Sequence, residues 1–563
     1  MPAAPTRRDL VLRDLDASTA RGDELDLVVI GGGINGAGVA RDAARRGLRV
    51  LLVEQNDLAF GTSSRSSKLI HGGLRYLEQY HVHLVFESVS ERSRLLRLAP
   101  HLVQPLGFLF PVYQGDKNPL WLVRTGMWVY DALSLFRSPE PHRTLDPAEL
   151  ARLVPELRTE GLAGAPLYFD AATDDARLTL ETAIDAARSG ALVATWTKVV
   201  GLAPSGSRIR RVQLEDALDG RRYEVATRAV VNATGPWSDA LLGLAGSATR
   251  PLLRPTKGIH VVLDAARLPV PHAVVCRHPD DGRVLFVIPW GDRTYVGTTD
   301  TDEQVEPGQV RASHDDVRYL MRAIERYFPG REVREEHVLA TWAGLRPLVS
   351  DGEGGSSESD VSREHKIFVG EGGMITVAGG KLTTYRKMAA EIVDVAVAEL
   401  TAHGLLTRTL RKAETEEAPL PGALGFDATE EGRARLAAEI VGLGTLGRDV
   451  AAHLVATYGA RAREVAARTA GDPAAGAPIT AGRPDVLAQV DFAIDEELAA
   501  TIADVLDRRT QISLRDGAHG LPGLDALADR MAARLGWSAA RTEEEKARYR
   551  ASVALQEAWR SEP

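Results

Sequence analysis

The hydrophobic positions near the N-terminus predict a parallel strand–helix–strand unit. Residues 26–30 (DLVVI) form the short, continuous apolar run that is typical of a strand buried on both faces. A helical stretch follows at 34–46 and stops at Gly47, and a second buried strand is expected at 48–53. This unit is the building block of a doubly wound α/β sheet.

Later hydrophobic runs predict further strands of this sheet and a second sheet inserted between them. Strand-like runs at 229–232 (AVVN) and 374–378 (MITVA) both lead into glycines, so we assign them to the same sheet. Between them, segments such as 284–288 (VLFVI) are rich in aromatic and β-branched residues, which predicts an inserted antiparallel sheet. Beyond Pro419 and Pro421 the chain becomes rich in Ala, Leu, Glu and Arg with helical spacing. A separate helical domain is therefore expected at the C-terminal end.

Together these patterns predict an α/β fold: a doubly wound, Rossmann-like dinucleotide-binding domain with an inserted antiparallel-sheet substrate domain, plus an all-helical C-terminal domain. The polar first residues lack the apolar segment of a secretory signal, and we expect a flexible extension there. The predicted boundaries are 1–24 for the extension; 25–100, 170–257 and 346–400 for the discontinuous dinucleotide-binding domain; 101–169 and 258–345 for the substrate domain; and 417–563 for the helical domain.

The most apolar stretch, Trp121 to Phe136, has two interpretations. Arg124 and Asp131 interrupt it, and it is too short to span a membrane. It is either a core helix or a surface that dips into a membrane interface, where Trp and Tyr are favoured. The chain has no apolar run of about 18 residues or more, so no spanning helix is expected.

Composition narrows the classes of partner. A chain of 563 residues is too long for one ordinary core, and 44% apolar with 26% charged residues is typical of folded soluble proteins. The formal net charge of −9 does not suit nucleic acid. The single cysteine, Cys276, excludes an intrachain disulfide and any thiolate cluster for a metal, and we expect no metal site.

The first motif with a chemical role is the glycine-rich turn after the first strand. Gly31, Gly33 and Gly36 give G-x-G-x-x-G at the start of a helix, whose free N–H groups can face a pyrophosphate. Glu54 ends the next strand, where a carboxylate accepts hydrogen bonds from an adenosine ribose. An acidic residue at this place argues against a 2′-phosphorylated cofactor.

Three further segments also point to this cofactor. Residues 61–76 (GTSSRSSKLIHGGLRY) combine hydroxyls, cations and glycines, which suits an anion or the polar edge of a flavin; the alternative is a polar loop before a helix. Residues 232–238 (NATGPWS) return the chain to the sheet edge. Residues 379–386 (GGKLTTYR) provide a second helix start, suited to the negative charge of a reduced flavin. Two such ends favour FAD over NAD.

At this point the motifs become specific. The segments GGGINGAGVARDAARRG, TSSRSSKLIHGGLRYLEQ, KGIHVVL, GTTDT, AGLRPL and VAGGKLTTYRKMA resemble, in their order and spacing, the FAD-dependent glycerol-3-phosphate dehydrogenases. The resemblance covers roughly residues 24–545, and its C-terminal part is similar to the helical domain of that family.

The resemblance implies non-covalently bound FAD and a basic substrate site. It implies that Arg346, Arg363 and Arg75 or Lys381 enclose the substrate phosphate and hydroxyls, and that His260 lies close to the reacting carbon. We therefore predict His260, Arg346 and Arg75 as catalytic residues. We predict Arg75, Arg346, Arg363, Lys381 and His260 as substrate-binding residues. The predicted cofactor-binding residues are Gly31, Gly33, Asn35, Gly36, Glu54, Thr62, Ser63, Ser64, Ser67, Lys68, His71, Gly72, Val199, Gly235, Gly380, Lys381, Leu382 and Thr383.

The resemblance also implies an activity and an electron acceptor. Glycerol 3-phosphate is expected to lose its C2 hydroxyl proton and pass a hydride from C2 to flavin N5, with His260 as the base; Arg346 is the competing candidate. The usual acceptor is a membrane quinone, which implies a homodimer attached peripherally to the cytoplasmic face of the plasma membrane. Relatives that use oxygen carry an insertion before the C-terminal domain, and no long insertion lies between Arg386 and Pro419.

Two rival functions make different demands on the sequence. An oxidase of an amine or amino acid needs a carboxylate clamp and an apolar slot. A protein that holds a flavin only structurally has no need of the complete basic set formed by Arg75, His260, Arg346, Arg363 and Lys381. Both rivals fit this sequence less well.

Overall fold

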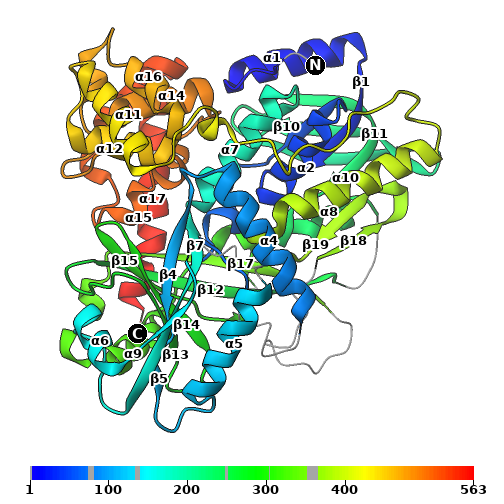
Figure 1. The fold of residues 1–563 in the computed structure, drawn as a ribbon. Coiled ribbons are helices and arrows are strands. Elements are labelled where there is room, and N and C mark those ends of the chain that lie inside the picture. Colours follow the sequence, from blue (N-terminus) through cyan, green and yellow to red (C-terminus); the bar gives the residue numbers. More distant parts are fainter. Residues whose placement is uncertain are drawn as a thin grey trace.

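The computed structural model describes residues 3–73, 81–133, 140–246, 251–302, 305–350 and 365–562, which form two sheets and a helical domain (Figure 1). The first sheet has eight described strands, with β18-β19-β11-β1-β2-β8 in order and β10 and β9 continuing from β11. These strands are β1 (Glu24–Ile30), β2 (Val50–Val53), β8 (Leu192–Ala194), β9 (Thr197–Ser205), β10 (Arg208–Asp216), β11 (Arg222–Asn232), β18 (Lys366–Val369) and β19 (Ile375–Ala378).

The centre of this sheet is parallel, as predicted. β1 pairs in parallel with both β2 and β11, and the apolar run from Leu27 to Ile30 is buried. Buried central strands of this kind need apolar residues on both faces. Helices α2 (Ile34–Arg45), α7 (Asp175–Arg188) and α10 (Tyr385–Ala402) pack together beside the sheet. Gly38 permits the close approach of α2 and α10, because a Cβ there would lie 3.0 Å from the Cβ of Ala389.

The second sheet has eleven described strands and is mostly antiparallel. Its order is β16-β12-β15-β14-β13-β4-β7-β3, with β17 beside β12 and with β5 and β6 beside β7. These strands are β3 (Leu69–Ile70), β4 (Val103–Leu109), β5 (Val112–Tyr113), β6 (Arg143–Leu145), β7 (Leu162–Thr173), β12 (Leu253–Asp264), β13 (Ala273–Arg277), β14 (Val284–Trp290), β15 (Arg293–Gly297), β16 (Thr301–Asp302) and β17 (Ala340–Val349). Helices near this sheet are α4 (Val82–Leu98), α5 (Leu120–Leu133), α6 (Pro147–Leu153) and α9 (His314–Tyr327).

The strands of the second sheet run across the predicted domain boundaries. The breaks expected after residues 169, 257 and 345 fall inside β7, β12 and β17. β17 pairs with β12 over its full length, so both strands belong entirely to the second sheet. A continuous hydrogen-bonded ladder, which local composition does not mark, decides where this sheet begins and ends.

The C-terminal part consists of helices joined by loops, with no strand of the two sheets among its described residues, and the predicted fold class is confirmed. Its helices are α11 (Glu430–Gly442), α12 (Arg448–Tyr458), α13 (Ala462–Ala467), α14 (Leu487–Glu496), the π-helix η11 (Asp504–Arg509), α15 (Ile512–Arg515), α16 (Leu524–Leu535) and α17 (Ala539–Glu557). The short 3-10 helices of the chain are η1 (Thr62–Ser64), η2 (Gly235–Trp237), η3 (Pro307–Gln309), η4 (Pro329–Arg331), η5 (Glu335–His337), η6 (Glu371–Gly373), η7 (Leu382–Thr384), η8 (Pro421–Ala423), η9 (Gly459–Arg461), η10 (Pro473–Gly476), η12 (Leu521–Gly523) and η13 (Ala558–Ser561).

Two segments differ from the expectation. The N-terminal stretch expected to be a flexible extension contains helix α1 (Arg8–Arg21), whose Val11 and Leu15 are buried and whose Arg8 forms a 2.7 Å ion pair with Asp216. Helix α5 is not a core helix over its whole circumference, because Trp121 is 67% exposed and other apolar residues of the helix also face outward. In the described residues, no helix combines the length and the apolar character that crossing a membrane requires.

Candidate cofactor and substrate site

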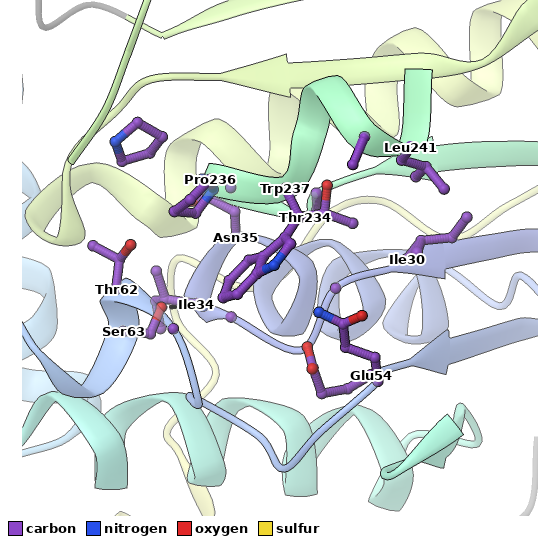
Figure 2. A pocket seen from close by; sticks show the side chains of 18 of the residues that line it. Ile30, Ile34, Asn35, Glu54, Thr62, Ser63, Thr234, Pro236, Trp237 and Leu241 are labelled. Carbon is purple, nitrogen blue, oxygen red and sulfur yellow. Dashed lines mark hydrogen bonds between the residues drawn. The ribbon is translucent and has the colours of Figure 1, made fainter. Parts of the chain in front are cut away.

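A cavity of about 520 Å³ lies at the carboxyl edge of the first sheet (Figure 2). It is positioned by the register of the parallel strands, because Ile30 pairs with both Val53 and Asn232 and the residues that follow all three meet at one edge. Predicted cofactor-binding residues that line it are Gly31, Gly33, Asn35, Glu54, Thr62, Ser63, Val199, Gly235, Gly380, Lys381 and Leu382.

The glycine-rich turn is shaped by close backbone approaches. A Cβ on Gly31 would lie 2.5 Å from the carbonyl oxygen of Ala233, and one on Gly36 would lie 1.8 Å from the oxygen of Gly31. Gly36 therefore lies behind the cavity and lets helix α2 approach the strand, whereas Gly31 and Gly33 line the cavity. The backbone N–H groups at the start of α2 lie at the place where a pyrophosphate is bound in such folds.

Glu54 is held at one end of the cavity by backbone N–H groups. Its carboxylate accepts hydrogen bonds from the N–H of Gly32 at 2.6 Å and from that of Asn56 at 2.8 Å. Burial raises the pKa of Glu54 to about 7, because it outweighs these two hydrogen bonds. The carboxylate is thus oriented and poorly solvated, as an acceptor for ribose hydroxyls should be.

The side chains of the loop at 61–68 point in two directions. Thr62, Ser63 and Ser66 line the cavity, and the Ser63 hydroxyl accepts a 2.9 Å hydrogen bond from the N–H of Ile34. Lys68 instead points away into the protein, where its ammonium lies 2.6 Å from Asp175. Ser64 and Ser67, also predicted as cofactor-binding, are likewise absent from the lining.

Asp175, which sequence reasoning missed, holds this loop in place. Its carboxylate accepts from the hydroxyl of Ser66 at 2.7 Å and from the backbone N–H of Ser66 at 3.0 Å, in addition to the ammonium of Lys68. Asp175 lies at the start of α7, more than one hundred residues from the loop in the sequence. No local motif marks it.

Predicted cofactor residues outside the lining connect the segment at 61–76 with the segment at 379–386. The N–H of His71 donates to the hydroxyl of Thr383 at 3.2 Å, and the N–H of Gly72 donates to Asp170 at 3.1 Å. His71, Gly72 and Thr383 do not line this cavity, but they connect its wall to the second sheet. Lys381 and Leu382, immediately before Thr383, form the wall itself.

His260 lies on β12 in a fully enclosed environment. Its ring stacks on Trp342 with 4.5 Å between centroids, and Nε2 lies 2.9 Å from the hydroxyl of Ser67. Burial lowers the pKa of His260 well below its ordinary value, and the charges of Arg346 and Lys68 lower it further. The imidazole is therefore neutral at physiological pH.

Arg346 lies on β17 opposite Thr256, four residues along the strand from Trp342, which is the residue opposite His260. Its guanidinium donates to Asp300 at 3.0 Å and to the hydroxyl of Thr298 at 3.0 Å. Gly258 makes room for it, since a Cβ there would lie 2.4 Å from Nη2 of Arg346. The next residue, Pro347, lines the cavity. The predicted site residues Arg75 and Arg363 lie outside the described residues.

The cavity also has lining residues that were not predicted individually, although several lie in the predicted cofactor segments. Trp237 lies across it between Thr62 and Glu54 in Figure 2, and its indole N–H donates to Glu306 at 3.2 Å. The signal was present, since Trp237 follows the Ala-Thr-Gly return, but tryptophan is not specific for cofactor binding. The other lining residues that were not predicted individually are Ile30, Ile34, Val53, Gln55, Gly61, Ser66, Thr197, Lys198, Val200, Ala233, Thr234, Pro236, Ala240, Leu241, Leu244, Pro347 and Gly379.

These features suit a long dinucleotide with a flavin. The cavity extends from the Glu54 carboxylate, past the glycine-rich turn and the start of α2, to Lys381 and Leu382. Glu54 would hold the ribose, the turn and Ser63 the pyrophosphate, and the residues around Lys381 the flavin end.

Comparison with known proteins agrees with this geometry. Residues 26–386 match the family described as FAD dependent oxidoreductase, and residues 413–542 match the family described as C-terminal domain of alpha-glycerophosphate oxidase. Glycerol-3-phosphate dehydrogenase from Synechocystis is 37% identical over 93% of this chain and 95% of its own. Glycerol-3-phosphate dehydrogenase 2 from Mycobacterium tuberculosis is 39% identical over 94% of this chain and 88% of its own.

Solved structures also resemble this chain in their fold. The glycerol-3-phosphate dehydrogenase from Bacillus halodurans, complexed with FAD, has a TM-score of 0.78 and 29% identity, covering 96% of this chain and 97% of its own. L-alpha-glycerophosphate oxidase from Mycoplasma pneumoniae has a TM-score of 0.54 and 20% identity, covering 71% of this chain and 99% of its own, which is a likeness of fold alone.

The chain is therefore an FAD-dependent oxidoreductase. Within that class it belongs to the glycerol-3-phosphate dehydrogenase family, as its motifs predicted.

Proposed function

We propose that this protein oxidises sn-glycerol 3-phosphate to dihydroxyacetone phosphate and passes the electrons to a membrane quinone. The observation that carries the proposal is the nearly full-length similarity to glycerol-3-phosphate dehydrogenases, joined to a cavity with the features of an FAD site. FAD, when bound, accepts the hydride that leaves C2 of the substrate. The protein must bind the phosphate, hold the C2 hydroxyl and remove its proton.

The described residues suit these three tasks. His260 is neutral and can accept the hydroxyl proton, which a base that works near neutral pH must do. Arg346 is fixed by Asp300 and Thr298 and presents a permanent positive charge for the phosphate or for the forming alkoxide. Lys381 lines the cavity and adds a second cation. Arg75 and Arg363 stay predictions for the same phosphate site.

The decisive experiment separates the dehydrogenase from its oxygen-using alternative. The purified protein is mixed with sn-glycerol 3-phosphate without air, and its flavin absorbance is followed. We expect bleaching, rapid recovery with a soluble quinone and slow recovery with oxygen; sn-glycerol 1-phosphate serves as the control substrate. Fast recovery with oxygen alone identifies an oxidase, and absence of bleaching contradicts the proposed substrate.

Helix α5 supports attachment to a membrane. Trp121 and Trp128 are 67% and 61% exposed, and Leu122 and Val129 are exposed beside them. Their spacing places all four on one face of the helix. Aromatic residues with an apolar body and a polar edge favour the membrane–water interface. We propose that this face contacts the cytoplasmic surface of the plasma membrane, where the quinone is dissolved, and that the protein acts there as a homodimer.

Vesicle flotation tests this attachment. W121Q/W128Q should lose most of its binding to vesicles of phosphatidylglycerol and phosphatidylethanolamine, while its activity with a soluble quinone stays within twofold. L443Q, which changes an exposed apolar residue directly after α11 in the C-terminal domain, should still bind. Equal flotation of all three proteins contradicts the assignment of α5.

A further inference from the structure

The C-terminal helical domain contributes none of the described residues that line the cavity, which end at Leu382. It is nevertheless connected to the Glu54 end of the cavity by buried charges. We propose that the domain fixes the adenosine end of the FAD site through an Asp57–Arg508–Arg509 cluster, so that docking of the domain and FAD affinity depend on each other. The inference depends on the cofactor and not on the proposed substrate.

The cluster is fully enclosed. The side chain of Asp57 is 0% exposed, and those of Arg508 and Arg509 are 5% and 0% exposed. Arg509 donates to both carboxylate oxygens of Asp57, one of them at 2.8 Å, and Arg508 donates to the same carboxylate through Nε. Burial alone would raise the pKa of Asp57, but Arg509 and Arg508 lower it below its ordinary value. Asp57 is therefore a charged anchor whose partners both come from η11 of the C-terminal domain.

The anchored loop is the one that carries Glu54. Asp57 lies three residues after Glu54, and the same loop returns to the glycine-rich turn, where the N–H of Ala59 donates to the oxygen of Gly32 at 3.0 Å. Gly32 in turn donates its own N–H to the Glu54 carboxylate. Movement of Asp57 would thus disturb both the ribose carboxylate and the phosphate-binding turn.

A second contact reaches the cavity lining at Thr197, beside Glu54. Asp504 of η11 accepts a 3.1 Å hydrogen bond from the indole N–H of Trp196. The backbone N–H of Trp196 donates to the backbone oxygen of Asn56 at 2.6 Å. The backbone N–H of its neighbour Thr197, which lines the cavity, donates to the backbone oxygen of Glu54 at 2.7 Å. Arg508 also donates to Asp504 at 2.8 Å, so one short helix of the C-terminal domain contacts both the loop that carries Asp57 and the segment that carries Trp196.

Two variants weaken the cluster with little change in volume. D57N removes the negative charge, and R509K keeps the positive charge but loses the forked pair of hydrogen bonds. Dissociation constants are measured by titrating FAD into the full-length apoprotein. Both variants should raise the Kd for FAD about tenfold, within the range of coupling between linked sites. Turnover at saturating FAD should stay within twofold of the parent, because the reacting end of the site is unchanged.

R530K is the matched control. Arg530 makes a comparable forked ion pair with Asp491, but both residues lie within the C-terminal domain. This variant should leave the Kd for FAD within twofold of the parent value. Equal losses of thermal stability in the apo and FAD-bound forms of D57N, with an unchanged Kd, would show that the cluster only stabilises the fold and would overturn the proposal.

Hydrogen exchange on the unaltered chain tests the proposal even if a variant does not fold. Coupling is reciprocal, so FAD binding must stabilise the docked C-terminal domain. Backbone amides of residues 504–509 should exchange at least severalfold more slowly when FAD is added to the apoprotein, although none of these residues lines the cavity. Amides of α11, remote from the cluster, should change less. Equal exchange of 504–509 with and without FAD contradicts the coupling.

Discussion

The two ends of the site use burial in different ways. At one end, burial raises the pKa of Glu54 to about 7, while two backbone N–H groups hold its anionic form. In the proposed substrate region, which lies outside the lining of the cavity, burial lowers the pKa of His260, and the neighbouring cations Arg346 and Lys68 lower it further. Glu54 is therefore balanced between its two protonation states, whereas His260 is held firmly neutral.

This difference corresponds to two tasks. A cofactor-binding carboxylate needs its charge only when ligand hydroxyls donate to it, so neighbouring N–H groups that favour the anion are sufficient. A proton acceptor must be unprotonated before the substrate binds, and positive neighbours ensure this. We expect substitutions at the Glu54 end to change FAD affinity and substitutions at the His260 end to change turnover.

The largest effect should come from His260. H260N should lower kcat for sn-glycerol 3-phosphate by about 10²- to 10⁴-fold, the usual contribution of a general base, while FAD content stays unchanged. H278N is the control: His278 is also buried and stacks on Tyr319 at 3.5 Å, but it takes no part in the proposed site. If H260N keeps more than a tenth of the parent turnover, His260 is not the base and Arg346 becomes the better candidate.

Glu54 should give the next largest effect. E54Q keeps the size of the side chain but removes the charge-assisted hydrogen bonds, which are worth roughly 1.5–3 kcal/mol. The Kd for FAD should therefore rise by about 10- to 100-fold. Turnover at saturating FAD should change little. A large loss of turnover with an unchanged Kd would reverse the division of tasks between the two ends.

The sequence predicted those parts of the site that local geometry determines. The glycines of the G-x-G-x-x-G pattern and Glu54 follow from one strand–helix–strand unit, and Gly31, Gly33 and Glu54 line the cavity, whereas Gly36 does not. Lys68 belongs to an equally distinctive motif, yet its ammonium pairs with Asp175, which lies 107 residues away in the sequence. Residue types show that a loop is rich in cations and hydroxyls, but tertiary contacts decide which of these side chains face the ligand.

Prediction of the fold has the same limit, because local sequence patterns do not reveal tertiary contacts. Parallel strands and the helical C-terminal domain were predictable, because continuous apolar runs and helical spacing mark them. For helix α5 the sequence left two interpretations open, because a largely apolar helix looks like a core helix whether or not one of its faces is covered. Likewise, no local pattern connects Asp57 with Arg509, because 452 residues separate them.

The pH dependence of FAD binding should distinguish the two ends more finely. Glu54 has a raised pKa in the folded protein, so its protonated form stabilises the apoprotein at low pH and this contribution is lost as the pH rises from about 4.5 to about 7. FAD needs the ionised carboxylate. Its affinity should therefore rise about tenfold between pH 6 and pH 8, and E54Q should show no such rise. An equal rise in E54Q assigns the titration to another group.

The smallest effect should come from Ser67, whose hydroxyl lies 2.9 Å from Nε2 of His260. Loss of one neutral hydrogen bond costs about 0.5–1.5 kcal/mol, which corresponds to a decrease of about two- to tenfold in kcat. S67A should therefore lower kcat within this range and leave the Kd for FAD unchanged, because Ser67 does not line the cavity.

The hydroxyl orients the imidazole, so S67T should recover part of the lost turnover. S64A, in the same loop but without a contact to His260 among the described residues, serves as the control. A rise in the Kd for FAD in S67A with normal turnover would place Ser67 with the cofactor end and remove the sharp separation between the two ends of the site.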